Sequence, residues 1–283
     1  MNKDACPGPD SIPMRLLAKA DINVLQQLTS IFDASLKLGY YPKPWKLDNS
    51  IYVKKPGKDS YHTEKAYRRL SLTNTMGKLY ERILMNRITR KLEETDFFKN
   101  KGLYAYRKNQ NTTHALLHLV EDMSNAINNN KIGAAVMADL EGAFDAIWRN
   151  GIVFKLANAH ITGRLLLICN SFLHDRFSRN LVNSHVSEWI QTHIGVPQGS
   201  LLSVIFFLVY TNDLSAKPSN LPPPNPQDPE EEMKYADDFT LWVKADNITQ
   251  LQQQIKSKCE VFLNWCNQWR LSINPTKTEA IIF

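Results

Sequence analysis

The chain has 283 residues, 43% of them apolar, which suits one large domain or two modest ones with a sizeable core and argues against extensive disorder. The net charge is +6, but residues 37–108 hold 18 Lys+Arg against 7 Asp+Glu, so a basic segment of +11 faces an acidic remainder. The longest apolar run, 201–210, is too short to cross a bilayer, and no signal peptide or C-x2-C zinc pair is present. We expect an intracellular protein with no membrane partner, whose basic half attracts polyanions.

Along the first half of the chain, apolar residues at helical spacing predict core-facing helices over 22–36, 79–92 and 116–127. Residues 51–53 predict a strand that runs into a lysine-rich turn at 54–58. Tyrosines lie among the basic residues, which favours nucleic acid as the partner because aromatic rings stack on bases. A solvated helix surface is the alternative interpretation of the charges over 78–101.

The second half predicts a buried strand over 134–140, with Asp139 near its end, and a helix over 143–157. Gly195 and Gly199 lie in a turn where backbone can approach a ligand closely, and the turn leads into a helix over 201–213. Segment 217–232 is rich in proline and acidic residues, which predicts a surface loop. A helix over 247–269 and a strand over 277–283 follow, and an end inside a strand is expected of a fragment.

Two adjacent aspartates, Asp237 and Asp238, lie between aromatic and β-branched stretches that predict a hairpin. Two like charges about 4 Å apart repel by about 4 kcal/mol at an effective dielectric near 20, so we expect a cation beside them. A solvated turn is the alternative, since aspartate favours turns. If the strands that carry Asp139 and this pair are neighbours in one antiparallel sheet, three carboxylates converge and can hold two Mg²⁺ ions for phosphoryl transfer. Taken alone, Asp139 is an ordinary strand-end aspartate.

Three blocks of the sequence, 138–145, 195–203 and 235–238, resemble in the same order the catalytic blocks of the reverse transcriptase domain of non-LTR (LINE-type) retrotransposons. Segments 7–13, 55–58 and 67–72 resemble that family's fingers motifs, and 271–283 resembles its fourth palm motif. The resemblance implies an α+β fold of the right-hand polymerase type. It implies a fingers-like region with the start of the palm over 1–133, and a palm over 134–283 whose antiparallel sheet is backed by helices, with the thumb absent.

The resemblance also implies roles for individual residues. Two Mg²⁺ ions, for which Mn²⁺ is able to substitute, would bind Asp139, Asp237, Asp238 and the carbonyl of Leu140. Lys277 would donate a proton to the departing pyrophosphate, completing a catalytic set with the three aspartates. The expected nucleotide-binding residues are Phe144, as a steric gate against a 2′-hydroxyl, with Gln198, Gly199, Arg68 and Lys55. A core aromatic for Phe144 and a surface lysine for Lys277 are the alternatives.

The implied function is RNA-directed DNA polymerase activity with an RNA template, a DNA primer and dNTP, in a ribonucleoprotein of the nucleus or cytoplasm. Without a thumb, we expect weak and poorly processive synthesis from this truncated chain. Two alternatives stay open at this point. The first is a catalytically inactive relic that only binds nucleic acid, and the second is an RNA-dependent RNA polymerase, which Phe144 disfavours. The oligomeric state is left open.

Overall fold

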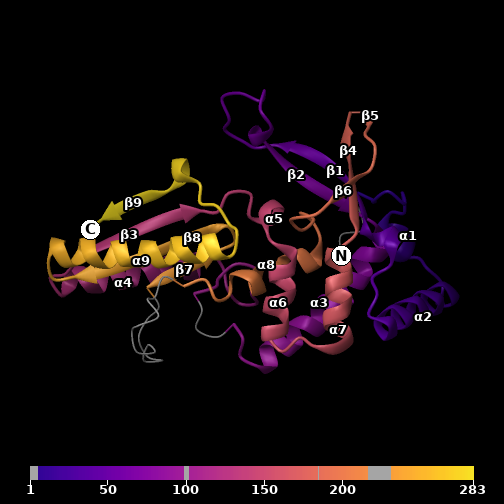
Figure 1. Cartoon of the computed structure of the whole chain (residues 1–283), viewed down its shortest axis with the longest axis horizontal. Helices are drawn as coiled ribbons and strands as arrows, with labels where there is room; N and C mark the ends of the chain where they lie inside the picture. Colours follow the sequence, from indigo (N-terminus) through magenta and orange to yellow (C-terminus); the bar gives the residue numbers. More distant parts are fainter. Residues whose placement is uncertain (1–5, 99–101, 184, 216–230) are drawn as a thin grey trace. The chain divides into compact units, whose positions relative to one another are not determined.

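The computed structural model describes residues 6–98, 102–183, 185–215 and 231–283, which form two compact units (Figure 1). The first unit comprises Met1–Thr95 and Ile147–Phe207, and the second comprises Asp96–Ala146 and Leu208–Phe283. Each unit is therefore built from two separate stretches of chain. The functional boundary between 133 and 134 stays a prediction. In the described part of the chain, no helix combines the length and apolarity needed to span a membrane.

The first unit contains a mixed sheet. β1 (Leu47–Lys54) pairs antiparallel with β2 (Tyr67–Thr73) and parallel with β4 (Arg176–Val182), and β4 also pairs with β5 (His185–Val186) and β6 (Ile190–Thr192). One face of this sheet is polar and buried: Ser178 Oγ lies 2.8 Å from Ser50 Oγ and donates to Asp48 Oδ1 at 2.8 Å. The other face is half-buried to exposed.

The helices of the first unit are α1 (Met14–Leu17), α2 (Ile22–Leu38), α3 (Thr75–Glu94), α6 (Arg149–Asn158) and α7 (Gly163–Leu173), with the short helices η1 (Lys43–Lys46) and η2 (Glu64–Ala66). Helices α2, α3 and α7 contribute side chains to an aromatic core. Phe32 of α2 stacks on Tyr80 of α3 with ring centroids 4.7 Å apart, and Tyr41 meets Phe172 of α7 edge-on at 5.0 Å. Helix α8 (Leu201–Thr211) begins in this unit and ends in the second.

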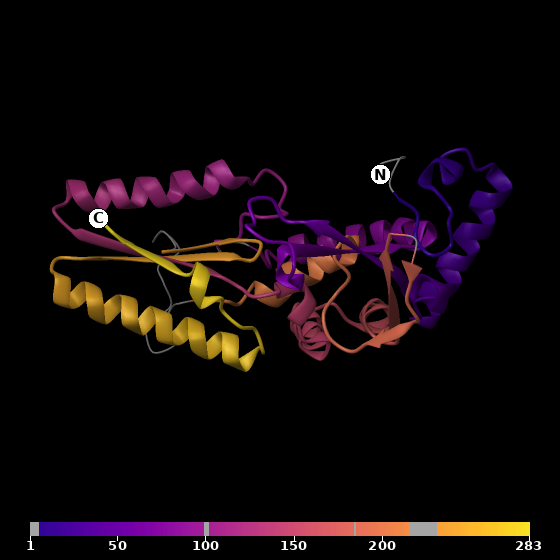
Figure 2. The same cartoon turned by 90° about the horizontal axis from the view of Figure 1, so that it is seen from above.

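The second unit contains an antiparallel sheet in the order β7 (Glu232–Tyr235), β8 (Asp238–Ala245), β3 (Ile132–Asp139) and β9 (Glu279–Ile282). Helices α4 (Thr112–Asn128) and α9 (Ile248–Gln268) cover its opposite faces (Figure 2). Because strand side chains alternate, Ala135 and Trp242 face α4, while Ala134 and Val243 face α9. The predicted palm sheet backed by helices is thus present.

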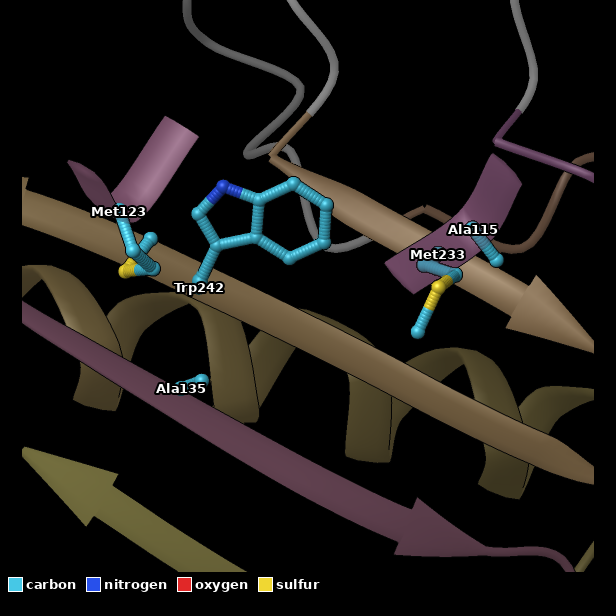
Figure 3. Packing of buried hydrophobic residues seen from close by; sticks show 5 residues of the cluster. All are labelled: Ala115, Met123, Ala135, Met233 and Trp242. Atoms are coloured by element: carbon cyan, nitrogen blue, oxygen red, sulfur yellow. The ribbon is translucent and has the colours of Figure 1, made fainter. Parts of the chain in front are cut away.

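Helix α4 is fixed to the sheet by both packing and polar contacts. Trp242 is fully buried among Ala115, Met123, Ala135 and Met233 (Figure 3). Its Nε1 donates to Asp122 Oδ2 of α4 at 2.6 Å, and Lys244 Nζ donates to Asp122 Oδ1 at 2.6 Å. A buried carboxylate with two donors avoids the cost of an unpaired buried charge.

Two expectations about the elements need correction, and a third lies mostly outside the described residues. The predicted helix over 143–157 is two helices, α5 (Ala143–Ala146) and α6, because the Ile147 carbonyl accepts from Gly195 N–H at 2.9 Å instead of continuing a helix. Segment 217–232 lies outside the described residues except for its last two, and Glu232 begins β7. The prediction that the helical apolar residues face the core is wrong for some of them. Ile22, Leu25 and Ile31 of α2 and Leu116, Val120 and Ile127 of α4 are exposed.

Candidate active site

The two adjacent aspartates lie at the tip of the β7–β8 hairpin, as predicted. Tyr235 pairs with Asp238, so Ala236 and Asp237 form the turn between the strands. Ala236 has φ 56°, in the left-handed region that is unfavourable for residues other than glycine. Backbone strain of this kind is concentrated at functional sites. Both aspartates are exposed, so their carboxylates are accessible from solvent.

Asp139 lies at the same end of the sheet. In the β3–β8 register it is the direct partner of Asp238, and Leu140 N–H donates to the Asp237 carbonyl at 3.0 Å. On the other side of β3, the Asp139 carbonyl accepts from Asn274 N–H at 2.8 Å. The predicted convergence of the carboxylates required β3 and β8 to be antiparallel neighbours, and they are. The three aspartates therefore lie at the same end of the sheet.

Lys277 is joined to this group by an ion pair. Its Nζ donates to both carboxylate oxygens of Asp139, at 3.0 and 2.9 Å. Lys277 ends the short helix η3 (Pro275–Lys277), whose first turn is capped by Asn274 through its Oδ1 contact with Thr276 N–H at 3.2 Å. The Lys277 ammonium therefore lies against the Asp139 carboxylate, where it would compete with a divalent cation.

The local electrostatics reflect crowded negative charge. Partial desolvation, followed by the charges of Asp237 and Asp139, raises the pKa of the Asp238 carboxyl, and the Lys277 ammonium opposes this rise. Desolvation, followed by the charge of Asp237, raises the pKa of the Tyr106 hydroxyl. Tyr106 was expected only as one of several aromatics in the basic segment, and its position beside Asp237 has no local signal in the sequence.

The donor atoms suit a hard divalent cation, since carboxylate and carbonyl oxygens are the ligands of Mg²⁺. As they stand, however, no three His, Cys, Asp or Glu side chains among the described residues are gathered closely enough to hold a metal ion. Binding would require Lys277 to leave Asp139 and the carboxylates to turn toward a common point. The assignment of Asp139, Leu140, Asp237 and Asp238 as ligands stays a prediction.

A cavity of about 400 Å³ adjoins the carboxylates within the second unit. Asp139, Asp238 and Lys277 line its polar side, while Ala115, Met137 and Met233 are among the apolar residues that line the rest. Phe144 lies close in sequence to these residues, on the short helix α5 after a turn in which Gly142 has φ 57°. Its side chain is half-buried, so it is neither a fully enclosed core aromatic nor a solvent-exposed one.

The predicted nucleotide-binding loop, 195–200, belongs to the first unit. Ser71 N–H of β2 donates to the Gln198 carbonyl at 2.8 Å. Gly199 has φ 114°, and a Cβ at this position would lie 3.1 Å from the Ser71 carbonyl oxygen, so both conformation and space favour glycine. The structure thus places Gln198 and Gly199 against the strand that carries Arg68.

Arg68 and Lys55 lie on the β1–β2 hairpin. Arg68 is exposed and pairs with Val53 in the register. Lys55 Nζ donates to the Lys65 carbonyl at 3.1 Å, across the loop that joins the two strands. Within the first unit, β2 is therefore the element that connects Arg68 with the Gln198 loop.

Two buried charged residues that the sequence did not reveal hold this loop. Arg149 donates from Nε to the Gly195 carbonyl at 2.7 Å and from a terminal nitrogen to the Ile194 carbonyl at 2.9 Å, and burial lowers its pKa to about 10. Glu81 of α3 accepts from Ser200 Oγ at 2.6 Å and from Leu201 N–H at 2.8 Å. Each contact joins residues more than 40 positions apart, so no local pattern could indicate it.

The family model described as "Reverse transcriptase (RNA-dependent DNA polymerase)" matches residues 53–282, which include the three blocks 138–145, 195–203 and 235–238. The chain belongs to the reverse transcriptase family. The resemblance found in the sequence is thereby confirmed.

Among curated relatives of this reverse transcriptase chain, the "RNA-directed DNA polymerase from mobile element jockey" of Drosophila melanogaster is 29% identical over 279 residues, 98% of this chain. The "Probable RNA-directed DNA polymerase from transposon BS" of the same species is 28% identical over 278 residues, 96% of this chain. The chain spans about 30% of the length of each of these relatives.

Among solved structures, an apo telomerase from Candida tropicalis truncated from its C-terminal domain superposes with a TM-score of 0.61, over 92% of this chain and 55% of that one. The sequences are 13% identical, so this likeness shows the fold alone. A second apo telomerase structure of the same species also gives 0.61, at 11% identity, over 92% of this chain and 49% of that one. The predicted α+β fold with polymerase fingers and palm is confirmed.

Proposed function

We propose that the chain is an RNA-directed DNA polymerase that transfers deoxynucleotides to the 3′-hydroxyl of a primer. The observation that carries this proposal is the pairing of Asp139 with Asp238 across β3 and β8, with Asp237 in the adjoining turn. Membership in the reverse transcriptase family supports it, as do the names of the jockey and BS relatives. An RNA template, a DNA primer and dNTP are the partners that this reaction requires.

Asp139, Asp237 and Asp238, with the Leu140 carbonyl, would hold two Mg²⁺ ions, for which Mn²⁺ can substitute. When bound, such a pair of ions activates the attacking hydroxyl and stabilises the departing phosphate oxygen. Desolvation, followed by the charges of Asp237 and Asp139, raises the pKa of Asp238, and this supports the assignment because a divalent cation would offset the repulsion between these charges. The chain itself contributes a fixed backbone frame around Asp139, so that little reorganisation is needed beyond side-chain rotation.

Lys277 would act as the proton donor to the departing pyrophosphate. Its ion pair with Asp139 supports this role, because it keeps an ammonium group beside the carboxylates before any ligand binds. A side chain that is 57% exposed can also leave the pair easily. Release from Asp139 would free the carboxylate and make the proton available at once.

The nucleotide would be bound by residues from several elements. Arg68 and Lys55 suit the triphosphate, because guanidinium and ammonium groups bind phosphate oxygens by charge-assisted hydrogen bonds. Gln198 and Gly199 would approach the base pair from a loop whose backbone is fixed. Phe144 would select deoxynucleotides by contact with the sugar. We assign the palm to residues 134–283 and the fingers-like region to 1–133, and place the enzyme in a ribonucleoprotein of the nucleus or cytoplasm.

Incorporation of labelled dTTP on an oligo(dT)-primed poly(rA) template with Mg²⁺ tests the proposal. The wild-type chain should extend the primer, and Asp237→Ala should abolish extension. Asp246→Asn is the matched control, since Asp246 is an exposed aspartate beyond the far end of β8 whose Oδ1 lies 3.8 Å from Lys131 Nζ. Extension that survives Asp237→Ala would show that the assigned site is wrong.

A second candidate function is nucleic-acid binding without catalysis. The observation that favours it is the ion pair of Lys277 with Asp139, in which the ammonium occupies both oxygens of the Asp139 carboxylate. On this hypothesis the wild-type chain binds primed RNA in a salt-sensitive way but incorporates no dTTP with either Mg²⁺ or Mn²⁺. Measurable incorporation by the wild type would exclude it.

A further inference from the structure

One face of the first-unit sheet is partly accessible, and among its residues only Arg68 has a role in the proposed function. Alternation along β1 turns Asp48 and Ser50 toward the buried polar side, so Asn49, Ile51 and Val53 point to the other side. We call this second side the open face. The residues on the open face are half-buried to exposed, and they include Arg68 of β2 and Arg179 of β4.

The charged residues of the open face are all basic. The positions that alternation assigns to it include two arginines and no acidic residue. They are Leu47, Asn49, Ile51 and Val53 of β1, Arg68, Leu70 and Leu72 of β2, and Phe177, Arg179 and Leu181 of β4. Guanidinium groups bind phosphate oxygens and apolar surface accepts the flat faces of bases, so the open face suits a nucleotide strand.

Trp189 and Arg179 form a stacked pair of side chains at the edge of this face. The Arg179 guanidinium carbon lies 4.5 Å from the centroid of the Trp189 ring, and Arg179 Nε donates to Asn49 Oδ1 at 2.8 Å. The hydrogen bond fixes the guanidinium, and the cation–π contact fixes the indole over it. Trp189 still exposes 36% of its surface, so a preorganised aromatic ring remains available for stacking.

We propose that the open face binds the unpaired part of the RNA template, with a base stacked on Trp189 and the adjacent phosphate near Arg179. Stacking on an aromatic side chain tolerates every base, as a template-binding surface must. The basic segment 37–108, which supplies β1 and β2, has the charge to attract this strand. The inference rests on the proposed function, since only an RNA-copying enzyme has a template overhang to bind.

Fluorescence anisotropy with primer–template duplexes tests the inference. The two probes carry 5′ RNA overhangs of one and six nucleotides, and EDTA keeps binding independent of synthesis. The wild-type chain should bind the long overhang about tenfold more tightly than the short one. Trp189→Ala should bring this ratio close to one while leaving short-overhang affinity within about twofold, and Trp189→Phe should restore most of it.

Ile190→Ala is the matched control. Ile190 is the next residue, 57% exposed, and pairs with Ser178, so its side chain points away from the open face. This variant should keep the wild-type ratio. If the circular-dichroism melt shows that Trp189→Ala is unfolded, Arg179→Gln is used instead. This variant removes the guanidinium that stacks on Trp189, so it should also lower the ratio of long-overhang to short-overhang affinity.

Three results would overturn the inference: a wild type with no preference for the long overhang, a Trp189→Ala variant that keeps it, or an equal loss of affinity for both probes. A wild type that prefers the long overhang but incorporates no dTTP would contradict the proposed function and leave the RNA-binding face in place. The two failures are therefore distinguishable.

Discussion

Asp139 is the most constrained of the residues assigned to catalysis. Its strand partner is Asp238, its carbonyl accepts from Asn274 N–H, and its carboxylate accepts from Lys277. By contrast, Asp237 lies in a two-residue turn next to the strained Ala236. The site therefore combines the Asp139 carboxylate, which is held by several contacts, with the adjacent Asp237 and Asp238 at a tight turn. The turn sets the direction in which these two side chains point.

Phe144→Val should weaken discrimination against ribonucleotides. A smaller side chain at the gate leaves room for the 2′-hydroxyl, so the ratio of kcat/KM for dTTP over UTP should fall by at least about tenfold. Single-nucleotide incorporation with each substrate measures it. Phe154→Val serves as the control, because Phe154 is an exposed phenylalanine on α6. An unchanged ratio in Phe144→Val would mean that Phe144 is a packing residue.

Glu81 links two elements of the first unit. Its carboxylate, fully buried on α3, accepts from Ser200 Oγ and from Leu201 N–H, and so caps the start of α8 directly after the Gln198 loop. Burial raises its pKa above the ordinary 4.5, because desolvation outweighs the hydrogen bonds. Glu81 is therefore one of the two buried side chains that fix the position of the loop, and its negative charge is costly to bury.

Glu81→Gln should flatten the dependence of stability on pH. The folded-state pKa of Glu81 is raised, so its stabilising contribution is complete below 4.5 and is lost as pH rises through the folded pKa. A glutamine oxygen can still accept from Ser200 and Leu201, and the variant should be at least as stable as wild type at pH 7. Melting temperatures from pH 4 to 8 measure this.

Glu81→Ala should instead lower the free energy of unfolding by about 3 kcal/mol, since it removes the shared acceptor and leaves a cavity. A glutamine variant as unstable as the alanine variant would contradict this account of Glu81.

The hairpin, the strand before Asp139 and the main helices could be predicted because each has a local signal: apolar periodicity, turn residues or flanking β-branched residues. The sequence predicts convergence of Asp139 with Asp237 and Asp238 only if their strands are neighbours, and the direct pairing of Asp139 with Asp238 is known from the structure alone. Arg149 and Glu81 could not be found, because a buried charge satisfied by distant backbone looks in sequence like a surface residue. The exposed Leu116 and Val120 were misassigned for a related reason: periodicity identifies an apolar stripe but not whether the chain covers it.

Charge is distributed unevenly over the whole molecule. Residues 37–108, with a net +11, supply the β1–β2 hairpin and α3 of the first unit, whereas the three aspartates belong to the second. Long-range attraction of a polyanion and binding of a divalent cation are thus assigned to different parts of the chain. Phosphate contacts made by the basic segment should dominate affinity for nucleic acid without regard to sequence.

RNA binding should therefore be strongly salt-dependent. With roughly four phosphate contacts, the slope of log K against log salt is about −3, and affinity for single-stranded RNA falls about 50-fold between 50 and 200 mM NaCl. Anisotropy titrations over this range measure the slope. Lys54→Gln and Lys58→Gln, at exposed lysines of the basic segment, should each reduce the magnitude of the slope by about 0.7, while Lys256→Gln, at an exposed lysine of α9, should not. A slope near zero would contradict the polyanion assignment.

The three-aspartate site is tested by the single-turnover rate of dTTP incorporation with Mg²⁺, measured for Asp139→Asn and for Asp246→Asn. Asp139→Asn should lose at least about a thousandfold in rate, because an amide is a poor ligand for a divalent cation, while Asp246→Asn should keep the wild-type rate. A rate for Asp139→Asn within tenfold of wild type would contradict a catalytic site built on Asp139, Asp237 and Asp238.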